Sequence, residues 1–266
     1  MNPTALQVEI RARPPGETVA LAARMVQHRP GPFIGAWLFY TLGTLALGHL
    51  ILGVWEWHWA WALVFVPLLA PVFSLPMVTT AGHLVFSPKV SFGTVALATL
   101  RRGGSFLLLF LANRLLTLVG LVALIVPGLY LWRSSWFFAP IVALEGSGMG
   151  PSFRRGRRFA IGFHGHVIGH AFNVALLLIY LSVAFASLAH FLAVDVFGQT
   201  FPFLAELPGR DLYYPYVGLV GFALAVPFAT LVWFFVYLDV RIRKEGWDLE
   251  IAFRARAAQL LEQSRG

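Results

Sequence analysis

Histidine and asparagine side chains recur at helical spacing in one apolar stretch of the chain. His166, His170 and Asn173 follow one another at i, i+4 and i+7, which places them on one face of a helix. Two histidines four residues apart can bind zinc or haem. The chain has no cysteine and no HExxH pattern that would complete such a site. The spacing therefore favours polar packing, and we predict no metal and no cofactor.

A second polar pair, Asn113 and Arg114, interrupts another apolar stretch. A charge at bilayer depth costs several kcal/mol unless it is paired or hydrated. With a rise of about 1.5 Å per residue, Arg114 would lie about 20 Å, and Glu145 about 26 Å, below a turn at Pro127-Gly128. We therefore predict a contact between Arg114 and Glu145. It would be either an ion pair that fixes helix register or one wall of a headgroup or substrate pocket.

Further charges follow the apolar stretches and would lie together at the inner membrane interface. They can tie two spans to a basic surface helix, either as a structural clamp or as a functional site. The predicted structural or binding cluster contains Arg114, Glu145, Arg154, Arg155, Asp239 and Arg241.

The composition indicates that these residues belong to an integral membrane protein. Of the 266 residues, 58% are hydrophobic and 12% are charged, against about 25% charged residues in ordinary globular chains. The 24 phenylalanines and 9 tryptophans exclude a disordered chain, and the lack of cysteine excludes a disulfide scaffold. Stretches of about 20 apolar residues can span a bilayer. Six such spans are predicted, at residues 33–53, 59–78, 106–126, 129–144, 167–194 and 216–238.

The basic residues give these spans an orientation. Seventeen of the 20 lysines and arginines fall on one side, Arg114 and Arg133 lie within spans, and Arg210 alone falls on the other side. Basic loops stay in the cytoplasm, so both termini are predicted to be cytoplasmic. The positive charge would then face the anionic lipids of the inner leaflet and needs no nucleic acid.

Basic segments at residues 17–29, 92–102 and 152–161 are predicted to form interfacial helices. Each is followed by two spans, and each joint contains Arg, Gly and Phe in that order, which suggests a three-fold internal repeat. The predicted organisation is a flexible cytoplasmic N-terminus (1–16), a six-helix membrane domain (17–250) and a cytoplasmic amphipathic tail (251–266). The fold class is thus an all-α polytopic bundle.

Three stretches, at residues 126–133, 139–155 and 237–249, resemble one family. They are similar to the membrane domain attached to some bacterial glycerophosphoryl diester phosphodiesterases, and to related stand-alone bacterial membrane proteins of unknown function. The resemblance implies the fold and a location in the bacterial cytoplasmic membrane. It does not imply hydrolysis, because the catalytic part of that family is a separate soluble domain, and these residues form the membrane bundle.

The function favoured by these patterns is a non-enzymatic membrane module. It would bind lipid, most readily anionic lipid, or a partner membrane protein at the inner leaflet. The alternative is a small transporter or channel with a polar path between spans three and five, formed by Asn113, Arg114, His170 and Asn173. A third hypothesis, an intramembrane enzyme acting on lipid, would need a buried His–Arg constellation that faces a lateral opening.

Overall fold

The computed structural model describes residues 14–55, 58–87, 90–123, 125–160, 164–201 and 211–246. These ranges are helical apart from short connections and contain no strand, which confirms the predicted all-α class. Of the predicted N-terminal segment 1–16, only residues 14–16 are described, and the predicted tail 251–266 lies outside the described residues.

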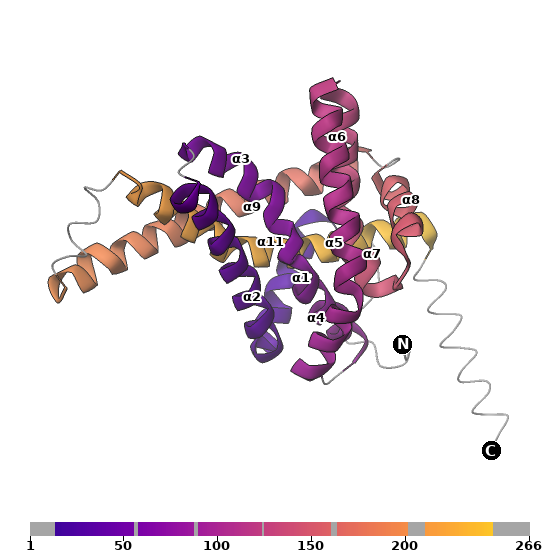
Figure 1. Cartoon of the computed structure of the whole chain (residues 1–266). Helices are drawn as coiled ribbons and strands as arrows, with labels where there is room; N and C mark the ends of the chain where they lie inside the picture. Colours follow the sequence, from indigo (N-terminus) through magenta and orange to yellow (C-terminus); the bar gives the residue numbers. More distant parts are fainter. Residues whose placement is uncertain are drawn as a thin grey trace, which may run out of the picture.

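The first half of the described chain forms α1 (Pro15–His28), α2 (Pro30–His49), η2 (Leu50–Val54), α3 (Trp59–Leu69), η3 (Ala70–Ser74), α4 (Leu75–Phe86) and α5 (Phe92–Ala123). The second half forms α6 (Ile125–Ser134), η4 (Ser135–Phe137), α7 (Phe138–Glu145), α8 (Met149–Ala160), α9 (His164–Phe191), η5 (Leu192–Val196), η6 (Phe197–Gln199) and α11 (Tyr213–Glu245). Figure 1 shows their arrangement.

Five helical segments are long and apolar enough to cross a membrane, which places the chain among multi-pass membrane proteins. They are Pro30–Val54, Trp59–Val85, Phe92–Ala123, Val167–Gln199 and Tyr213–Glu245. These segments coincide with the predicted first, second, third, fifth and sixth spans. The third ends at Ala123, three residues earlier than predicted.

The predicted fourth span, at residues 129–144, is built differently and is not among these five segments. It is divided into α6, the short 3-10 helix η4 and α7. The turn before it was predicted at Pro127-Gly128, and this prediction is wrong, because both residues lie in the first turn of α6. A proline is tolerated in the first turn of a helix, since the amide groups there have no hydrogen-bond partner within the helix. Gly128 allows close packing instead, because a Cβ atom there would lie 2.5 Å from the backbone nitrogen of Leu121 in α5.

The basic surface helices are present in part as predicted. α1 covers residues 17–28 of the first predicted segment, and α8 begins three residues earlier than the third and covers its residues 152–160. The predicted middle helix, 92–102, is not separate, because α5 continues through Gly103 and Gly104 into the apolar span. A glycine inside a helix costs only about 1 kcal/mol, so two of them do not end it. The middle unit of the proposed repeat therefore lacks the joint found between α1 and α2.

α11 lies at the centre of the bundle and packs against α9, α2, α1 and α4. It is apolar around most of its circumference, and 67% of the residues in its most apolar 18-residue stretch are buried inside the protein. In the segment Val167–Gln199, which is mostly α9, the corresponding stretch has no buried residue (0%). A helix that is apolar all round belongs in a core, whereas the exposed apolar side of α9 suits contact with lipid. The α5–α6 hairpin projects from this packed body (Figure 1).

The core beneath α8 is aromatic. The rings of Trp136 and Trp233 meet edge to face at 5.1 Å between centroids, and those of Phe159 and Tyr237 do so at 5.7 Å. The indole N–H of Trp233 donates to the carbonyl of Trp136 at 2.7 Å. These contacts attach α8 and the α6–α7 segment to α11, and so fix the position of the charged residues on α7 and α8.

Candidate anion-binding site

α8 is strongly amphipathic, with one buried face and one basic, exposed face. Ser152, Gly156, Phe159 and Ala160 are buried, while its arginines lie on the exposed or half-exposed side. Arginines with their apolar stems along the protein surface and their charged ends in the headgroup region are typical of interfacial helices. The basic residues of α8 are therefore held outside the core by the apolar residues on its other face.

Two local features set the position of α8 relative to α7. Gly146 ends α7 in the left-handed region, with φ of +60°, and its amide donates to the carbonyl of Val142 at 3.2 Å. The left-handed residue turns the chain sharply, as glycine does after many helices. The hydroxyl of Ser152 then donates to the carbonyl of Ser147 at 3.1 Å and closes the connection.

Gly156 brings α8 into direct contact with the α6–α7 segment. A Cβ atom at this residue would lie 2.5 Å from the Phe138 ring and 2.9 Å from the carbonyl oxygen of Ser134. No side chain fits at that distance without displacing the helix. The absence of a side chain at Gly156 is therefore a structural requirement for this arrangement of α7 and α8.

A network of charges joins α7, α8 and α11. Arg155 lies 2.7 Å from Glu145 on α7 and 2.6 Å from Glu245 on α11, measured from guanidinium nitrogen to carboxylate oxygen. The hydroxyl of Tyr237 donates to the same Glu145 carboxylate at 2.7 Å. Arg241 completes the network through Glu245 at 3.3 Å. Arg155 is thus balanced by two carboxylates and acts as the connection between the three helices.

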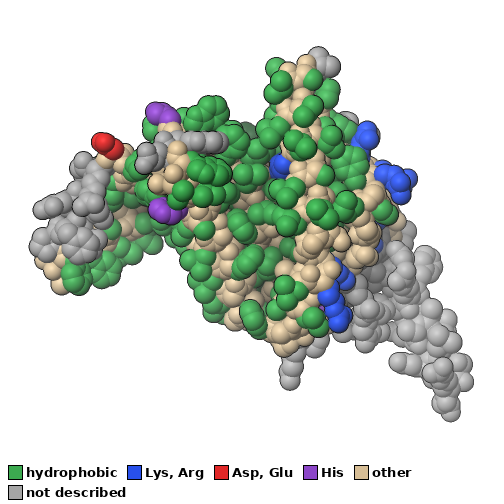
Figure 2. All heavy atoms as spheres, viewed as in Figure 1, with side chains coloured by type: hydrophobic (Ala, Val, Ile, Leu, Met, Phe, Trp, Pro, Cys, Tyr) green, Lys and Arg blue, Asp and Glu red, His purple; other side chains and the backbone are tan. Residues whose placement is uncertain are grey.

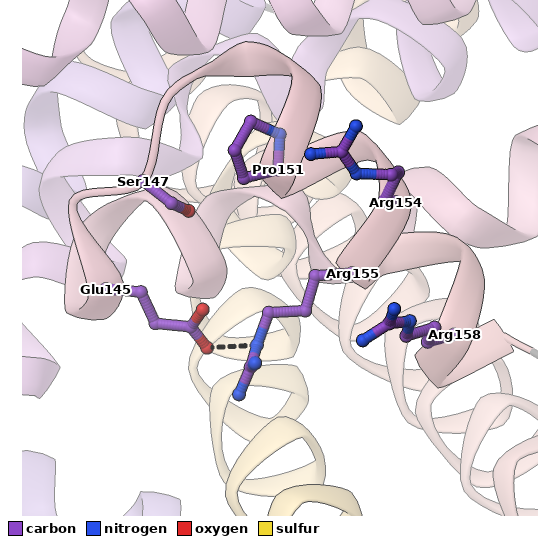
Figure 3. A pocket seen from close by; sticks show the side chains of 6 residues that line it. All are labelled: Glu145, Ser147, Pro151, Arg154, Arg155 and Arg158. Carbon is purple, nitrogen blue, oxygen red and sulfur yellow. Dashed lines mark ion pairs between the residues drawn. The ribbon is translucent and has the colours of Figure 1, made fainter.

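Beside this network lies an open pocket of about 340 Å³. Its lining residues are Glu145, Ser147, Pro151, Arg154, Arg155 and Arg158. In Figure 3 the guanidinium group of Arg158 points toward Arg155, and that of Arg154 extends toward Pro151; both residues line the pocket. Within the described part of the chain, neither guanidinium has a hydrogen-bond or ion-pair partner. The pocket therefore offers two cations that are free to bind a ligand.

Other cations near the pocket are already engaged. Arg102 of α5 donates to the carbonyl of Ala143 at the end of α7. Lys244 of α11 donates to the carbonyls of Arg158 and Phe159, at 2.5 and 3.2 Å. Arg157 lies over the Tyr130 ring at 5.5 Å. Cations that close helix ends or stack on aromatic rings stabilise the fold. Arg154 and Arg158 differ from these cations, because no comparable contact with a described residue holds them.

Of the predicted charge cluster, the structure brings Glu145, Arg155 and Arg241 into one network and places Arg154 at the adjoining pocket. Asp239 has different partners. Its carboxylate is 2.9 Å from Arg243 and 3.7 Å from the Nε2 atom of His170 on α9, and both Asp239 (2% exposed) and His170 (1%) are buried. Asp239 therefore joins α9 to α11, whereas the network of Glu145 joins α7 and α8 to α11.

The predicted contact between Arg114 and Glu145 is wrong. Arg114 is buried (5% exposed) and lies over the Phe110 ring at 4.5 Å, while Glu145 binds Arg155 and Tyr237. The expectation assumed a straight hairpin that turned at Pro127-Gly128. The structure instead divides the returning segment into α6, η4 and α7, and Glu145 at the end of α7 faces α8.

The polar residues predicted to lie together, which are Asn113, His166, His170 and Asn173, are found in different places. The Asn113 amide donates to the carbonyl of Leu131 on α6 at 3.2 Å, whereas His170 faces Asp239 on α11. Asn173 donates to the carbonyl of Gly169 on its own helix at 3.1 Å. His166 lies on α9, and its side chain is outside the described residues. Among the residues that the structure describes, no three His, Cys, Asp or Glu side chains are grouped to hold a metal ion.

Sequence reasoning missed Tyr237, Glu245 and Arg158. Tyr237, Arg241 and Glu245 recur at intervals of four along α11, and Arg154 and Arg158 do the same along α8. That spacing places each set on one helix face. The periodicity could have identified both polar faces, although not which helix each face would meet.

Comparison with protein-family models, with curated proteins and with solved structures finds no match. The resemblance to the membrane domain of glycerophosphoryl diester phosphodiesterases therefore stays a prediction, and the function has to be argued from the site itself.

Proposed function

We propose that this chain is a multi-pass protein of the bacterial cytoplasmic membrane whose α8 pocket binds the phosphate of an anionic lipid in the inner leaflet. In this proposal the protein is a binding module without catalytic activity. The observation that carries the proposal is a pair of arginines, Arg154 and Arg158, that line one pocket beside the Glu145–Arg155 ion pair and have no partner among the described residues.

The distribution of charge supports the orientation. In Figure 2, Lys and Arg side chains gather along one side, while the Asp, Glu and His side chains visible in this view lie toward the opposite side. A basic side faces the cytoplasm in most membrane proteins. In the proposed topology α6, η4 and α7 together make the fourth crossing, so that both termini are cytoplasmic and α8 lies among the inner headgroups.

The chemistry of the pocket supports an oxyanion as the ligand. Guanidinium groups bind phosphate through two parallel N–H···O bonds, and such charge-assisted bonds are stronger than neutral ones. The one carboxylate among the lining residues, Glu145, is held by Arg155 and Tyr237 and does not compete for Arg154 or Arg158. A volume of about 340 Å³ also lies within the usual range of small-molecule sites.

The transport alternative finds less support in the geometry. A polar path between spans three and five would require Asn113 and Arg114 to face His170 and Asn173. In the structure the first pair packs within the α5–α6 hairpin and against Phe110, whereas His170 pairs with α11. We therefore favour the lipid-binding module.

The proposal is tested by native mass spectrometry of the protein released from nanodiscs that contain phosphatidylcholine and phosphatidylglycerol. The pocket variant is Arg154→Gln/Arg158→Gln. The control, Arg24→Gln/Arg101→Gln, removes two exposed arginines from α1 and α5 and so changes the net charge equally. We expect wild type and control to retain phosphatidylglycerol and the pocket variant to lose it. Equal retention by both variants would show that lipid is held by charge alone and would reject the pocket.

A further inference from the structure

We infer that the α8 pocket selects a phosphate monoester over a phosphate diester. The inference rests on the proposed function and names the class of ligand that the same pocket takes. It follows from the net charge of the described residues that line the pocket, and from the difference in charge between the two kinds of phosphate.

The charges around the pocket can be counted from their contacts. Arg155 is balanced by Glu145 and Glu245, and Arg241 shares Glu245. Four of the lining residues that the structure describes are charged, and two of them, Glu145 and Arg155, form a neutral pair. Arg154 and Arg158 remain, so the pocket presents two positive charges to a ligand.

A monoester matches this charge better than a diester does. A phosphate monoester carries a charge of about −1.5 to −2 at pH 7, because its second pKa is near 6. It also has three terminal oxygens, enough to accept paired N–H bonds from two guanidinium groups. A diester, like the phosphate of a nucleic-acid backbone, carries a single charge. It would leave one of the two arginines unneutralised.

The ionisation of the ligand gives the inference its own pH dependence. Binding of a monoester should strengthen between pH 5.5 and 7.5 as the second proton leaves, whereas binding of a diester should not change. Among the residues that the structure describes, the charged or titratable side chains of the pocket, of its ion-pair network and of the cations around them are Arg102, Arg133, Glu145, Arg154, Arg155, Arg157, Arg158, Tyr237, Arg241, Lys244 and Glu245. None is a histidine, the side chain whose ordinary pKa lies in that interval.

The test is a titration of the purified full-length protein in micelles, read by native mass spectrometry. The probes are dioctanoyl phosphatidic acid, which is a monoester, and dioctanoyl phosphatidylglycerol, which is a diester. At pH 7.5 we expect phosphatidic acid to bind about tenfold more tightly, a modest ratio for one additional charge beside two guanidinium groups. At pH 5.5 the ratio should fall to about twofold or threefold. In Arg154→Gln/Arg158→Gln the preference should disappear, while Arg24→Gln/Arg101→Gln should keep it.

Equal affinity for the two lipids at pH 7.5, or a ratio that does not change with pH, would overturn the inference. If binding still depended on Arg154 and Arg158, the proposed lipid-binding function would nevertheless stand. Loss of that dependence for both lipids would overturn the two together. Inorganic phosphate added as a competitor separates the sources of the monoester: displacement at concentrations similar to that of the lipid would identify a soluble phosphate as the ligand.

Discussion

At its C-terminal end α11 holds its neighbours through charged groups, whereas at its N-terminal end it holds them through tyrosine hydroxyls. Near the C-terminal end, Asp239 faces His170 of α9 and Glu245 binds Arg155 of α8. Near the N-terminal end, the hydroxyl of Tyr216 is hydrogen-bonded to His49 of α2 and that of Tyr213 to His190 of α9, each at 2.8 Å. The same helix therefore uses two kinds of polar chemistry to hold α9, one at each end.

The two ends of α11 should differ in how strongly the loss of one contact affects stability. A buried charge that loses its partner is costly, so charged contacts make an end rigid and sensitive to substitution. A neutral hydrogen bond contributes about 0.5–1.5 kcal/mol, so its loss is tolerated. The charged end is also the end that carries the proposed ligand pocket, where rigid positioning of Arg154 and Arg158 matters. The neutral end serves only to hold the helices together.

The largest effect that separates the two ends is expected for Asp239→Ala. The substitution removes the buried carboxylate that lies 2.9 Å from Arg243 and 3.7 Å from the buried His170. Breaking a buried charged pair costs about 3–5 kcal/mol. The measurement is the free energy of unfolding in bicelles by denaturant titration. Glu245→Gln, at the half-exposed part of the same end, is the control and should lose clearly less. A loss for Asp239→Ala no larger than for the control would remove the distinction between the buried and the half-exposed charges.

The second effect concerns the contact that places the pocket at the charged end. In Gly156→Ala the added methyl group would meet Phe138 and the Ser134 carbonyl, so overpacking should cost about 1–3 kcal/mol. The matched control is Gly150→Ala in the same helix, where nothing lies within 4 Å of the new atom. There the higher helix propensity of alanine should stabilise the protein by up to about 1 kcal/mol. Thermal unfolding in detergent should give opposite signs for the two variants, and the same sign for both would show that α8 does not approach α7 so closely.

The sequence was sufficient for the parts of this arrangement that depend on local pattern. Apolar length predicted six spans, five of which coincide with the segments that can cross a membrane, and the basic segment at residues 152–161 predicted the surface helix α8. Ser91 directly precedes the helix that begins at Phe92, and its Oγ accepts the amide of Thr94 at 3.2 Å, a cap that depends only on residue type. Each of these predictions needs only neighbouring residues, because helix formation and capping are local.

The contacts between helices were not predictable in the same way. The network of Glu145, Arg155 and Glu245 joins residues that are up to 100 positions apart, and it depends on the rotation of α7. The 3-10 segment η4 interrupts the helix before α7, and no residue pattern predicted it. Glu145 contacts Arg155 and Tyr237 in place of the predicted Arg114, so Glu145 was chosen correctly as a cluster residue but its partner was not.

The smallest effects should appear at the neutral end. Tyr216→Phe and Tyr213→Phe each remove one hydroxyl from a hydrogen bond with a histidine, and each should cost about 0.5–1.5 kcal/mol of unfolding free energy. Tyr214→Phe is the control, because Tyr214 is exposed and contacts His190 only through its ring. A double variant should lose about the sum of the single losses, since the two tyrosines bind different histidines on different helices. Losses equal to that of Asp239→Ala would mean that both ends of α11 are equally rigid, and that the pocket does not owe its position to charge.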